Sequence, residues 1–295
     1  MATQRQDLVL FSDQSVIPTV TENDPHRLFL ITSTHSSGPQ WLINALVETH
    51  TKGSSYSLNG NKVGNSSNSS SSNSSSSNSS SSRSTFSHSI TNLNKVTIIS
   101  FVHNENHYLS SFQKLQINSN QYTVIDCLTD FVQKQIPKFM NNKLALLQSI
   151  TDQLTNDIPN NNHIVILDQP EFLLSLVSGL TSNELWNNFI NPIWQKCKIL
   201  MINNNVDLFK GGILNSTVNK TFTEFQRFIT ICHHKSTVVL NLRPLTTGHA
   251  KDVTGTLRIT RGGVDWFNNS NTTIHVVENE YLYLTEKENT KLFYG

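Results

Sequence analysis

Short apolar runs recur along the chain, and helical patterns separate several of them. In three of five such runs the aliphatic residues are nearly uninterrupted, which is typical of central strands covered on both faces. We therefore predict parallel strands at these positions. The predicted strands are residues 27–32, 95–102, 122–127, 163–168 and 198–203.

The segments between these runs carry apolar residues at helical spacing. Alternation of strands and helices predicts an α/β fold, with a mostly parallel central sheet and helices on both faces. Gly179 is placed to end one helix, Thr181 and Glu184 have the spacing of a capping box, and Asn191-Pro192 is expected to interrupt the next helix. The predicted helices are residues 41–50, 128–135, 143–156 and 171–178.

The pattern changes after about residue 235, where strand-like pieces are separated by Gly or Asn turns. The pieces are residues 236–245, 252–263, 272–278 and 280–286. We read residues 236–295 as an antiparallel β extension of the same sheet. Residues 1–295 are then one domain, although the length alone would also suit two small ones.

Residues 65–82 consist only of Ser and Asn, which offer nothing to bury in return for the entropy of ordering them. With its flanks this tract runs over residues 52–93, between a predicted helix and a predicted strand. We interpret residues 52–93 as a disordered surface insertion and not as a domain boundary.

Composition narrows the function classes. Charged residues make up 15% of the chain, against about 25% in typical domains, and the net charge is +1. No global positive field attracts nucleic acid or an anionic membrane, so RNA contacts must be local or shared between subunits. The cysteines at 127, 197 and 232 form no CxxC, which argues against a disulfide framework. With no signal peptide or long apolar run, we expect a cytoplasmic and nuclear protein without membrane contact.

The loop TSTHSSGPQW follows the first predicted strand and precedes a helix, as a phosphate-binding P-loop does. A working P-loop reads GxxxxGK[ST], in which backbone N–H groups, a lysine and a hydroxyl hold phosphate and magnesium. When Gly38 is aligned with the second glycine, Ser33, Pro39 and Gln40 stand at the other three chemical positions. We interpret the loop as a vestigial P-loop that serves as a structural turn, with residual or composite nucleotide contact as the alternative.

Two further candidates have ordinary explanations. Asp168 ends an apolar strand where a magnesium-linked carboxylate would stand, but we expect it to cap the helix that begins near Pro170. His103 and His107 have the i, i+4 spacing of metal ligands, yet the order HNENH is not the HExxH of metalloproteases. We interpret this stretch as a polar loop leading into a helix, and no metal site is predicted.

Residues 240–263 form a locally basic segment. It contains four basic residues and one acidic residue, which gives a local charge of +3. The basic residues are Arg243, Lys251, Arg258 and Arg261, and the acidic residue is Asp252. Three interpretations remain open, namely a solvated hairpin, a subunit interface and an RNA phosphate contact.

Five stretches together carry a resemblance over nearly the whole chain outside the Ser/Asn tract. They are QRQDLVLFSDQSV, WLINALVETH, QPEFLLSLVSGLT, LRPLTTGHAKDVTGTLRITRGG and HVVENEYLYLTEKENTKLFY. They resemble the Elongator complex protein 6 family, in its fungal form. The resemblance implies a RecA-like ATPase fold without functional nucleotide-binding motifs, and the long Ser/Asn tract is the departure from the family's usual loop.

The resemblance also implies a function. In that family this subunit and two paralogues, subunits four and five, assemble into a heterohexameric ring attached to the Elongator catalytic core. The complex adds a carboxymethyl-type group to the wobble uridine (U34) of tRNA, and the ring binds tRNA in a manner that responds to ATP. Family descriptions also link the complex to transcription elongation.

We therefore hypothesise a non-catalytic ring subunit without a cofactor. RNA-binding candidates are Lys210, Lys220 and Arg258, and interface candidates are Arg243, Lys251, Asp252 and Arg261. One rival is an active NTPase with an atypical loop, in which His35, Arg5 or Arg27 replaces the missing lysine. Another is a metal hydrolase that uses His103 and His107.

Overall fold

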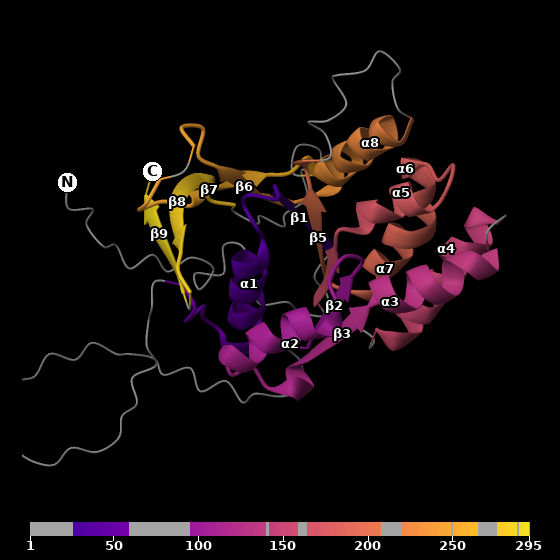
Figure 1. The fold of residues 1–295 in the computed structure, drawn as a ribbon, viewed down its shortest axis with the longest axis horizontal. Coiled ribbons are helices and arrows are strands. Elements are labelled where there is room, and N and C mark those ends of the chain that lie inside the picture. The colour runs from indigo at the N-terminus through magenta and orange to yellow at the C-terminus, as the bar shows by residue number, and fades with distance from the viewer. Residues whose placement is uncertain are drawn as a thin grey trace, which may run out of the picture.

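A single nine-stranded sheet organises the chain, in the order β3-β2-β4-β5-β1-β6-β7-β8-β9 (Figure 1). The computed structural model describes residues 26–58, 95–139, 142–158, 164–207, 220–248, 250–264, 276–287 and 289–294. The strands are β1 Arg27–Ser33, β2 Val96–Ser100, β3 Tyr122–Asp126, β4 Ile164–Asp168, β5 Ile199–Asn205, β6 Val238–Pro244, β7 Gly255–Arg261, β8 Asn279–Thr285 and β9 Thr290–Tyr294.

All pairings from β3 to β6 along this order are parallel, and those from β6 to β9 are antiparallel. The predicted α/β class, a mostly parallel sheet with antiparallel C-terminal strands, is confirmed. One boundary needs correction: β6 pairs in parallel with β1, so antiparallel pairing begins between β6 and β7 and not at residue 236. Residues 276–278, predicted as part of a strand, are not strand.

The helices fall close to the predicted positions. Four predicted helices are confirmed within a few residues. The bounds of α2 and α8 were not predicted, although a helix was expected after the stretch at residues 103–107. Gly179 has a φ of 71° and the Thr181–Glu184 capping box is present, as expected. The α-helices are α1 Gln40–Lys52, α2 Glu105–Lys114, α3 Cys127–Asp130, α4 Lys143–Asp157, α5 Leu173–Leu176, α6 Ser182–Leu185, α7 Asn191–Lys196 and α8 Lys220–Lys235.

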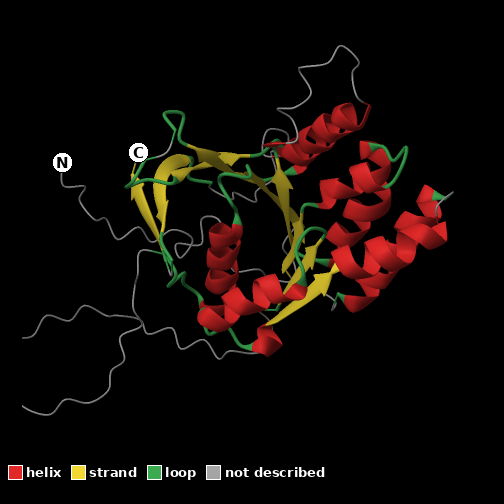
Figure 2. Cartoon of the chain, viewed as in Figure 1, coloured by secondary structure: helices red, strands yellow, loops and turns green. Residues whose placement is uncertain are grey.

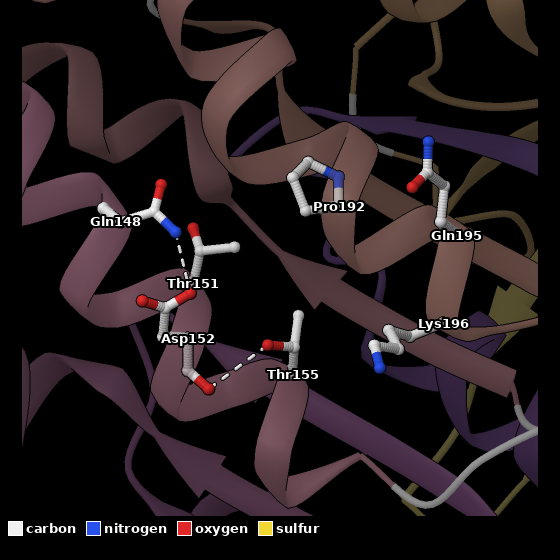
Figure 3. Close-up of a pocket in the computed structure, with 7 residues that line it drawn as sticks. All are labelled: Gln148, Thr151, Asp152, Thr155, Pro192, Gln195 and Lys196. Atoms are coloured by element: carbon white, nitrogen blue, oxygen red, sulfur yellow. Dashed lines mark hydrogen bonds between the residues drawn. The ribbon is translucent and has the colours of Figure 1, made fainter.

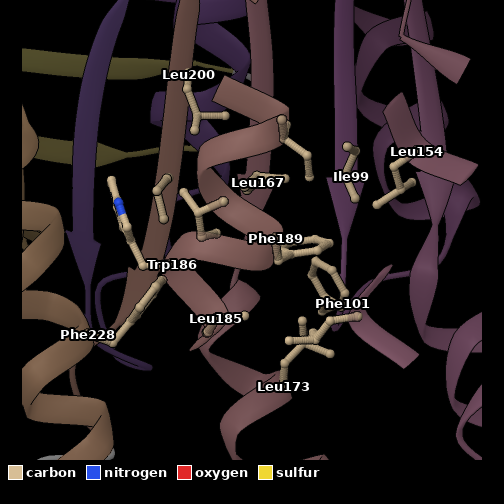
Figure 4. Packing of buried hydrophobic residues seen from close by; sticks show 14 of the residues in the cluster. Ile99, Phe101, Leu154, Leu167, Leu173, Leu185, Trp186, Phe189, Leu200 and Phe228 are labelled. Atoms are coloured by element: carbon tan, nitrogen blue, oxygen red, sulfur yellow. The ribbon is translucent and has the colours of Figure 1, made fainter. Parts of the chain in front are cut away.

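Two hydrophobic cores lie on opposite faces of the sheet. Alternate residues of each strand point to opposite faces, so Phe29 belongs to the first core and Leu30 to the second. The first core lies under α1 and α2, and the second under α3 to α8 (Figure 2). Figure 4 shows Phe101 and Phe189 meeting in the second core, with ring centroids 5.7 Å apart.

The prediction that Asn191-Pro192 interrupts a helix is wrong. A π-helical turn, Trp186–Ile190, leads directly into α7, and the Asn191 N–H donates to the Trp186 carbonyl. Proline has no N–H, so Pro192 leaves the carbonyl of Asn188 without its helical donor. The hydroxyl of Thr151 on α4 donates to that carbonyl at 2.9 Å, which lets the helical run continue.

Thr151→Val should therefore destabilise the fold. Valine keeps the shape of the buried threonine but removes the donor to Asn188, so we expect the free energy of unfolding to fall by about 1 kcal/mol. Thr155→Val on the same helix is the matched control, because its hydroxyl donates only within α4, to Asp152. Urea unfolding of both variants measures the difference, and equal losses would contradict the assignment.

The predicted insertion lies almost wholly outside the described residues, since residues 59–94 are not among them. Of its flanks, Leu58 forms an isolated parallel bridge with Thr290 at the start of β9. No helix in the described part of the chain has the length and apolar character needed to cross a bilayer.

Candidate functional site

Polar side chains stand at the carboxyl ends of three neighbouring parallel strands. Ser100 ends β2, Asp168 ends β4 and Asn203 lies near the end of β5. The strand register places Ser100 beside Asp168 and Asp168 beside Asn203. Ligands of open α/β sheets bind outside the carboxyl ends of the strands, so this is where a nucleotide site is expected.

The carboxyl group of Asp168 is bonded on both oxygens by the protein itself. Oδ1 accepts from the Asn203 amide at 2.7 Å. Oδ2 accepts from the Tyr108 hydroxyl at 2.6 Å and from the Ser100 hydroxyl at 2.9 Å. Asp168 is 2% exposed, so these three donors replace water around it. Asp168 thus has the surroundings of a structural carboxyl group and not of an open ligand to magnesium.

The prediction that Asp168 caps the following helix is wrong. The residue that precedes the short 3-10 turn at Pro170 is Gln169, which makes no capping bond from its side chain. Gln169 has a φ of 55°, and its N–H donates to the carbonyl of Asn203. The chain therefore leaves β4 in the left-handed region, while the Asp168 side chain stays under α2.

Tyr108 of α2 is the donor that sequence reasoning missed. Burial, followed by the neighbouring Asp168, raises the pKa of the Tyr108 phenol, so the hydroxyl keeps its proton and donates. No sequence motif indicates this contact, since it joins residues 60 positions apart. Ser100 and Asn203 could have been found from the sequence, because each is a polar residue that follows an apolar run of a predicted strand.

The turn after β1 is filled by its own hydroxyl groups. The Thr34 N–H donates to the Ser37 hydroxyl at 3.0 Å, and the Ser37 N–H donates to the Thr34 carbonyl at 3.1 Å. The two hydroxyls lie 2.7 Å apart. In a working P-loop the N–H groups of this turn wrap the phosphates. Here two of them are bonded within the turn.

A carboxyl group occupies a third N–H of the turn. Asp207, just beyond β5, accepts a hydrogen bond from the His35 N–H. The Val206 N–H donates to the Ser33 carbonyl at 2.8 Å, which holds the Asp207 segment against the turn. The Asp207 carboxylate also opposes a phosphate by charge repulsion. This contact, between residues 172 positions apart, has no sequence signal.

The remaining vestigial positions have structural contacts as well. Pro39 is the N-cap residue just before α1, and its carbonyl accepts from the N–H groups of Leu42 and Ile43. Gln40 stands where a P-loop hydroxyl would hold magnesium, but its side chain donates to Asn44 at 3.0 Å and bonds His107 at 2.8 Å. Gly38 has a negative φ and open space at its Cβ.

The turn is also tied to the antiparallel strands. The Ser37 hydroxyl, which is 0% exposed, donates to the carbonyl of Leu242 in β6 at 3.2 Å. In the first turn of α1, Trp41 packs on Tyr283 of β8 with ring centroids 4.9 Å apart. The turn thus joins the parallel and antiparallel parts of the sheet, which is a structural use of its shape.

His103 and His107 lie together, as their spacing suggested, although only His107 belongs to α2. Their ring centroids are 4.0 Å apart, and Nδ1 of His103 lies 3.7 Å from Oδ2 of Asp168. Burial, and then the adjacent His103, lowers the pKa of His107, which favours its neutral form. Among the described residues no group of three or more His, Cys, Asp or Glu side chains is arranged to hold a metal ion.

Of the candidate replacements for the P-loop lysine, Arg27 lies far from the turn. Arg27 is the buried first residue of β1, at the end of the strand opposite the turn. His35 is in the turn and exposed, with its N–H committed to Asp207. Arg5 lies outside the described residues, as does the RNA-binding candidate Lys210.

The other predicted contact residues are spread over several elements. Lys220 is exposed at the start of α8, and Lys251 and Asp252 are exposed between β6 and β7. Arg243 and Arg258 are exposed on the same face of β6 and β7. Arg261 ends β7 on the opposite face from Arg258, and its N–H donates to Glu278. The structure brings Arg243 and Arg258 together and separates them from Arg261.

Glu171 is a buried acid that the sequence did not single out. It is 1% exposed, and its Oε1 accepts from the Asn205 N–H at 2.8 Å. Burial raises its pKa to about 8, the Asn205 bond opposes that shift, and Asp168 adds to it. With its pKa raised in this way, Glu171 favours the protonated form at neutral pH.

A groove of about 410 Å³ lies between α4 and α7 (Figure 3). The second core and the sheet separate it from the Asp168 side chain, which faces α2. Its Asp152 accepts from Gln148 at 2.8 Å within α4. The lining residues are Gln148, Thr151, Asp152, Thr155, Pro192, Gln195 and Lys196, a polar set without a nucleophile and base in contact.

These features define an α/β protein with a mostly parallel sheet, in which the turn after β1 is closed by its own hydroxyl groups and by the Asp207 carboxyl group. Elongator complex protein 6 of Saccharomyces cerevisiae is 45% identical to this chain over 297 residues, which cover 99% of each protein. The chain belongs to the Elongator complex protein 6 family. No family model matches it.

Similarity to solved structures is more distant. The flagellar accessory protein FlaH from Methanocaldococcus jannaschii superposes with a TM-score of 0.48 at 14% identity, covering 99% of this chain and 97% of that chain. A DnaB-like replicative helicase superposes with a TM-score of 0.44 at 8% identity, covering 90% of this chain and 57% of the helicase chain.

Proposed function

We propose that this chain is a non-catalytic structural subunit of the Elongator complex. It joins subunits four and five in a heterohexameric ring attached to the catalytic core. The ring binds tRNA and supports 5-carboxymethyl-type modification of the wobble uridine, in the cytoplasm and nucleus. Family membership supports the Elongator assignment, since the 45% identity extends over 99% of the chain.

One observation carries the non-catalytic part of the proposal. The N–H groups of Thr34, His35 and Ser37 are bonded to protein atoms, where a P-loop would bind phosphate. Asp168 stands where a magnesium-linked carboxylate would be expected, and its carboxyl group already accepts hydrogen bonds from three protein donors. Phosphoryl transfer depends on positioning the phosphates and the metal, and neither group is available for that task.

The proposal that the ring binds tRNA depends on basic residues contributed by several subunits. With a net charge of +1 the chain has no strong field of its own, so basic loop residues from several subunits must act together. Lys210 and Lys220 are our candidates on this chain. Binding by the assembled ring should weaken steeply with salt, and the isolated chain should bind tRNA poorly.

Native mass spectrometry of this chain co-expressed with subunits four and five tests the assembly. The expected result is a six-membered species containing all three proteins. Filter binding of tRNA at increasing salt, with the ring and with the isolated chain, tests the shared site. A chain that stays monomeric beside its presumed partners would refute the ring, and full-strength monomer binding would refute the shared site.

Restoring the lysine and the hydroxyl of the P-loop should not create a nucleotide site. Pro39→Lys with Gln40→Thr supplies the lysine and the hydroxyl, but the N–H groups of Thr34, His35 and Ser37 remain bonded and Asp207 stays beside the turn. We expect no saturable ATP binding by either the double variant or the unsubstituted chain in equilibrium dialysis. Tight ATP binding by the double variant would show that the turn lacked only the lysine and the hydroxyl. That result would contradict the claim that the bonded N–H groups close the turn to phosphate.

A further inference from the structure

Strand β8 is apolar on both faces. Tyr281 and Tyr283 point into the first core, and the alternate residues Leu282 and Leu284 point to the opposite face, where they are half-buried. Antiparallel strands with one solvated face normally alternate apolar with polar residues. A strand with apolar residues on both faces is typical of a sheet that is covered on both sides.

The helical cover of this outer face ends at β6. Val239 packs in the second core with Phe228 and Cys232 of α8. The next outward residue of β6, Asn241, is already half-exposed, and Arg243 beyond it is exposed. In Figure 1 the curved strands β7 to β9 have α1 on their inner side, while α8 lies at the far end of β6.

The outward residues of β6 to β9 form a continuous surface, which we call the outer β patch. Leu282 lies opposite Thr256 of β7 and opposite Phe293 of β9. Both neighbours are half-buried, so apolar side chains run across β8 and β9, and Thr256 continues the surface onto β7. We define the outer β patch as Arg243, Thr256, Arg258, Leu282, Leu284 and Phe293, and the outward residues Asn241, Glu280 and Lys291 border it.

The two arginines give the patch a positive side. Arg258 lies opposite Asn241 on one neighbouring strand and opposite Glu280 on the other. The Arg243 guanidinium donates to the Asn241 side chain at 2.8 Å. Within the described part of the chain neither Arg243 nor Arg258 makes an ion pair. Both guanidinium groups are therefore available for a carboxylate of another molecule.

We propose that the outer β patch docks a neighbouring protein subunit of the Elongator complex, through a surface that combines carboxylates with apolar side chains. This inference rests on the proposed function and adds the surface to it. Carboxylates fit the arginines in bidentate geometry, and apolar side chains fit Leu282, Leu284 and Phe293. An apolar centre beside arginines is the composition of protein interfaces.

RNA fits this patch less well than protein does. On β8 the outward charged residue is Glu280, and the outward Lys291 of β9, opposite Leu284, is paired with Glu286. A phosphate backbone placed across the patch would meet the Glu280 carboxylate. A carboxylate-bearing protein can instead pair with Arg243 and Arg258 and place its apolar residues against β8 and β9.

Charge reversal and polar substitution in the assembled complex test the proposal. Arg258→Glu and Leu282→Asp should each reduce incorporation of this chain into complexes with subunits four and five and the core by about tenfold or more, as loss of an interface hot spot does. The matched controls are Lys114→Glu, exposed on α2, and Leu144→Asp, 48% exposed on α4. Both controls should assemble normally, and thermal melts should show that all four variants fold.

A charge swap separates a partner contact from pairing within the hairpin. If Arg258 served only Glu280, Arg258→Glu with Glu280→Arg would restore assembly, whereas a partner contact predicts that the defect persists. Normal assembly of the patch variants would overturn the inference and leave the proposed function standing. Normal assembly with weakened tRNA binding would assign the patch to RNA, and a dimer of the isolated chain broken by the same variants would assign it to self-association. Failure of the unsubstituted chain to assemble would overturn the proposed function.

Discussion

Replacing Asp168 with alanine should lower the free energy of unfolding by about 3 kcal/mol, because buried hydrogen-bond donors lose their acceptor and have no access to water. Tyr108, Ser100 and Asn203 all direct a donor at this carboxyl group, at 2.6 to 2.9 Å. Asp168→Asn keeps the shape and one acceptor oxygen, so its loss should be smaller, about 1–2 kcal/mol. Urea unfolding monitored by fluorescence gives both values.

The pair of variants separates a structural carboxyl group from a catalytic one. A magnesium-binding aspartate would lose its function on conversion to asparagine while the fold stayed nearly unchanged. Tyr108→Phe is the companion, since it removes one donor and leaves the ring in its core. Unfolding free energies of Asp168→Ala and the unsubstituted chain that agree within error would contradict the role given to Asp168.

Glu171 should make the stability of the fold depend on pH. Its pKa is about 8 in the folded chain, and the ordinary value is 4.5. Below pH 4.5 the folded and unfolded states both hold the proton. Between pH 4.5 and 8 only the folded state holds it, so stability falls as pH rises through this window and then levels off. The full loss is on the order of 3–5 kcal/mol.

Glu171→Gln should remove this slope, because glutamine cannot ionise and keeps an acceptor for the Asn205 N–H. The variant and the unsubstituted chain should have similar melting temperatures near pH 5, and the variant should melt higher at pH 8. Glu105→Gln, an exposed change of the same charge on α2, should leave the slope unchanged. A Glu171→Gln variant that melts below the unsubstituted chain at pH 8 would contradict the buried, protonated state.

The fold was predictable because its signals are local. Runs such as residues 164–167 are apolar at every position, which is typical of a strand covered on both faces, and the Thr181–Glu184 capping box was readable from spacing alone. The interruption predicted at Pro192 was wrong because the missing hydrogen bond to the Asn188 carbonyl is supplied by Thr151. Thr151 lies 41 positions before Pro192 and on another helix, so the sequence gives no sign of this contact. Strand β6 was assigned to the antiparallel part because its sequence says nothing about which neighbour it pairs with on each side.

The candidate site was predictable only in outline. The missing lysine and hydroxyl at Pro39 and Gln40 already indicated a turn without phosphate chemistry. What fills the turn was not visible, since Asp207 reaches His35 from a distant segment and Asp168 is bonded by Tyr108 of α2. Such contacts depend on the order of strands in the sheet, which brings β5 beside β1 and β4.

Isothermal titration of the isolated chain with ATP and magnesium tests the central claim most directly. With its turn N–H groups and Asp168 already bonded, the chain should give no saturable heat beyond dilution. Binding at one site per chain, abolished by Asp168→Ala in a variant that still folds, would contradict the account.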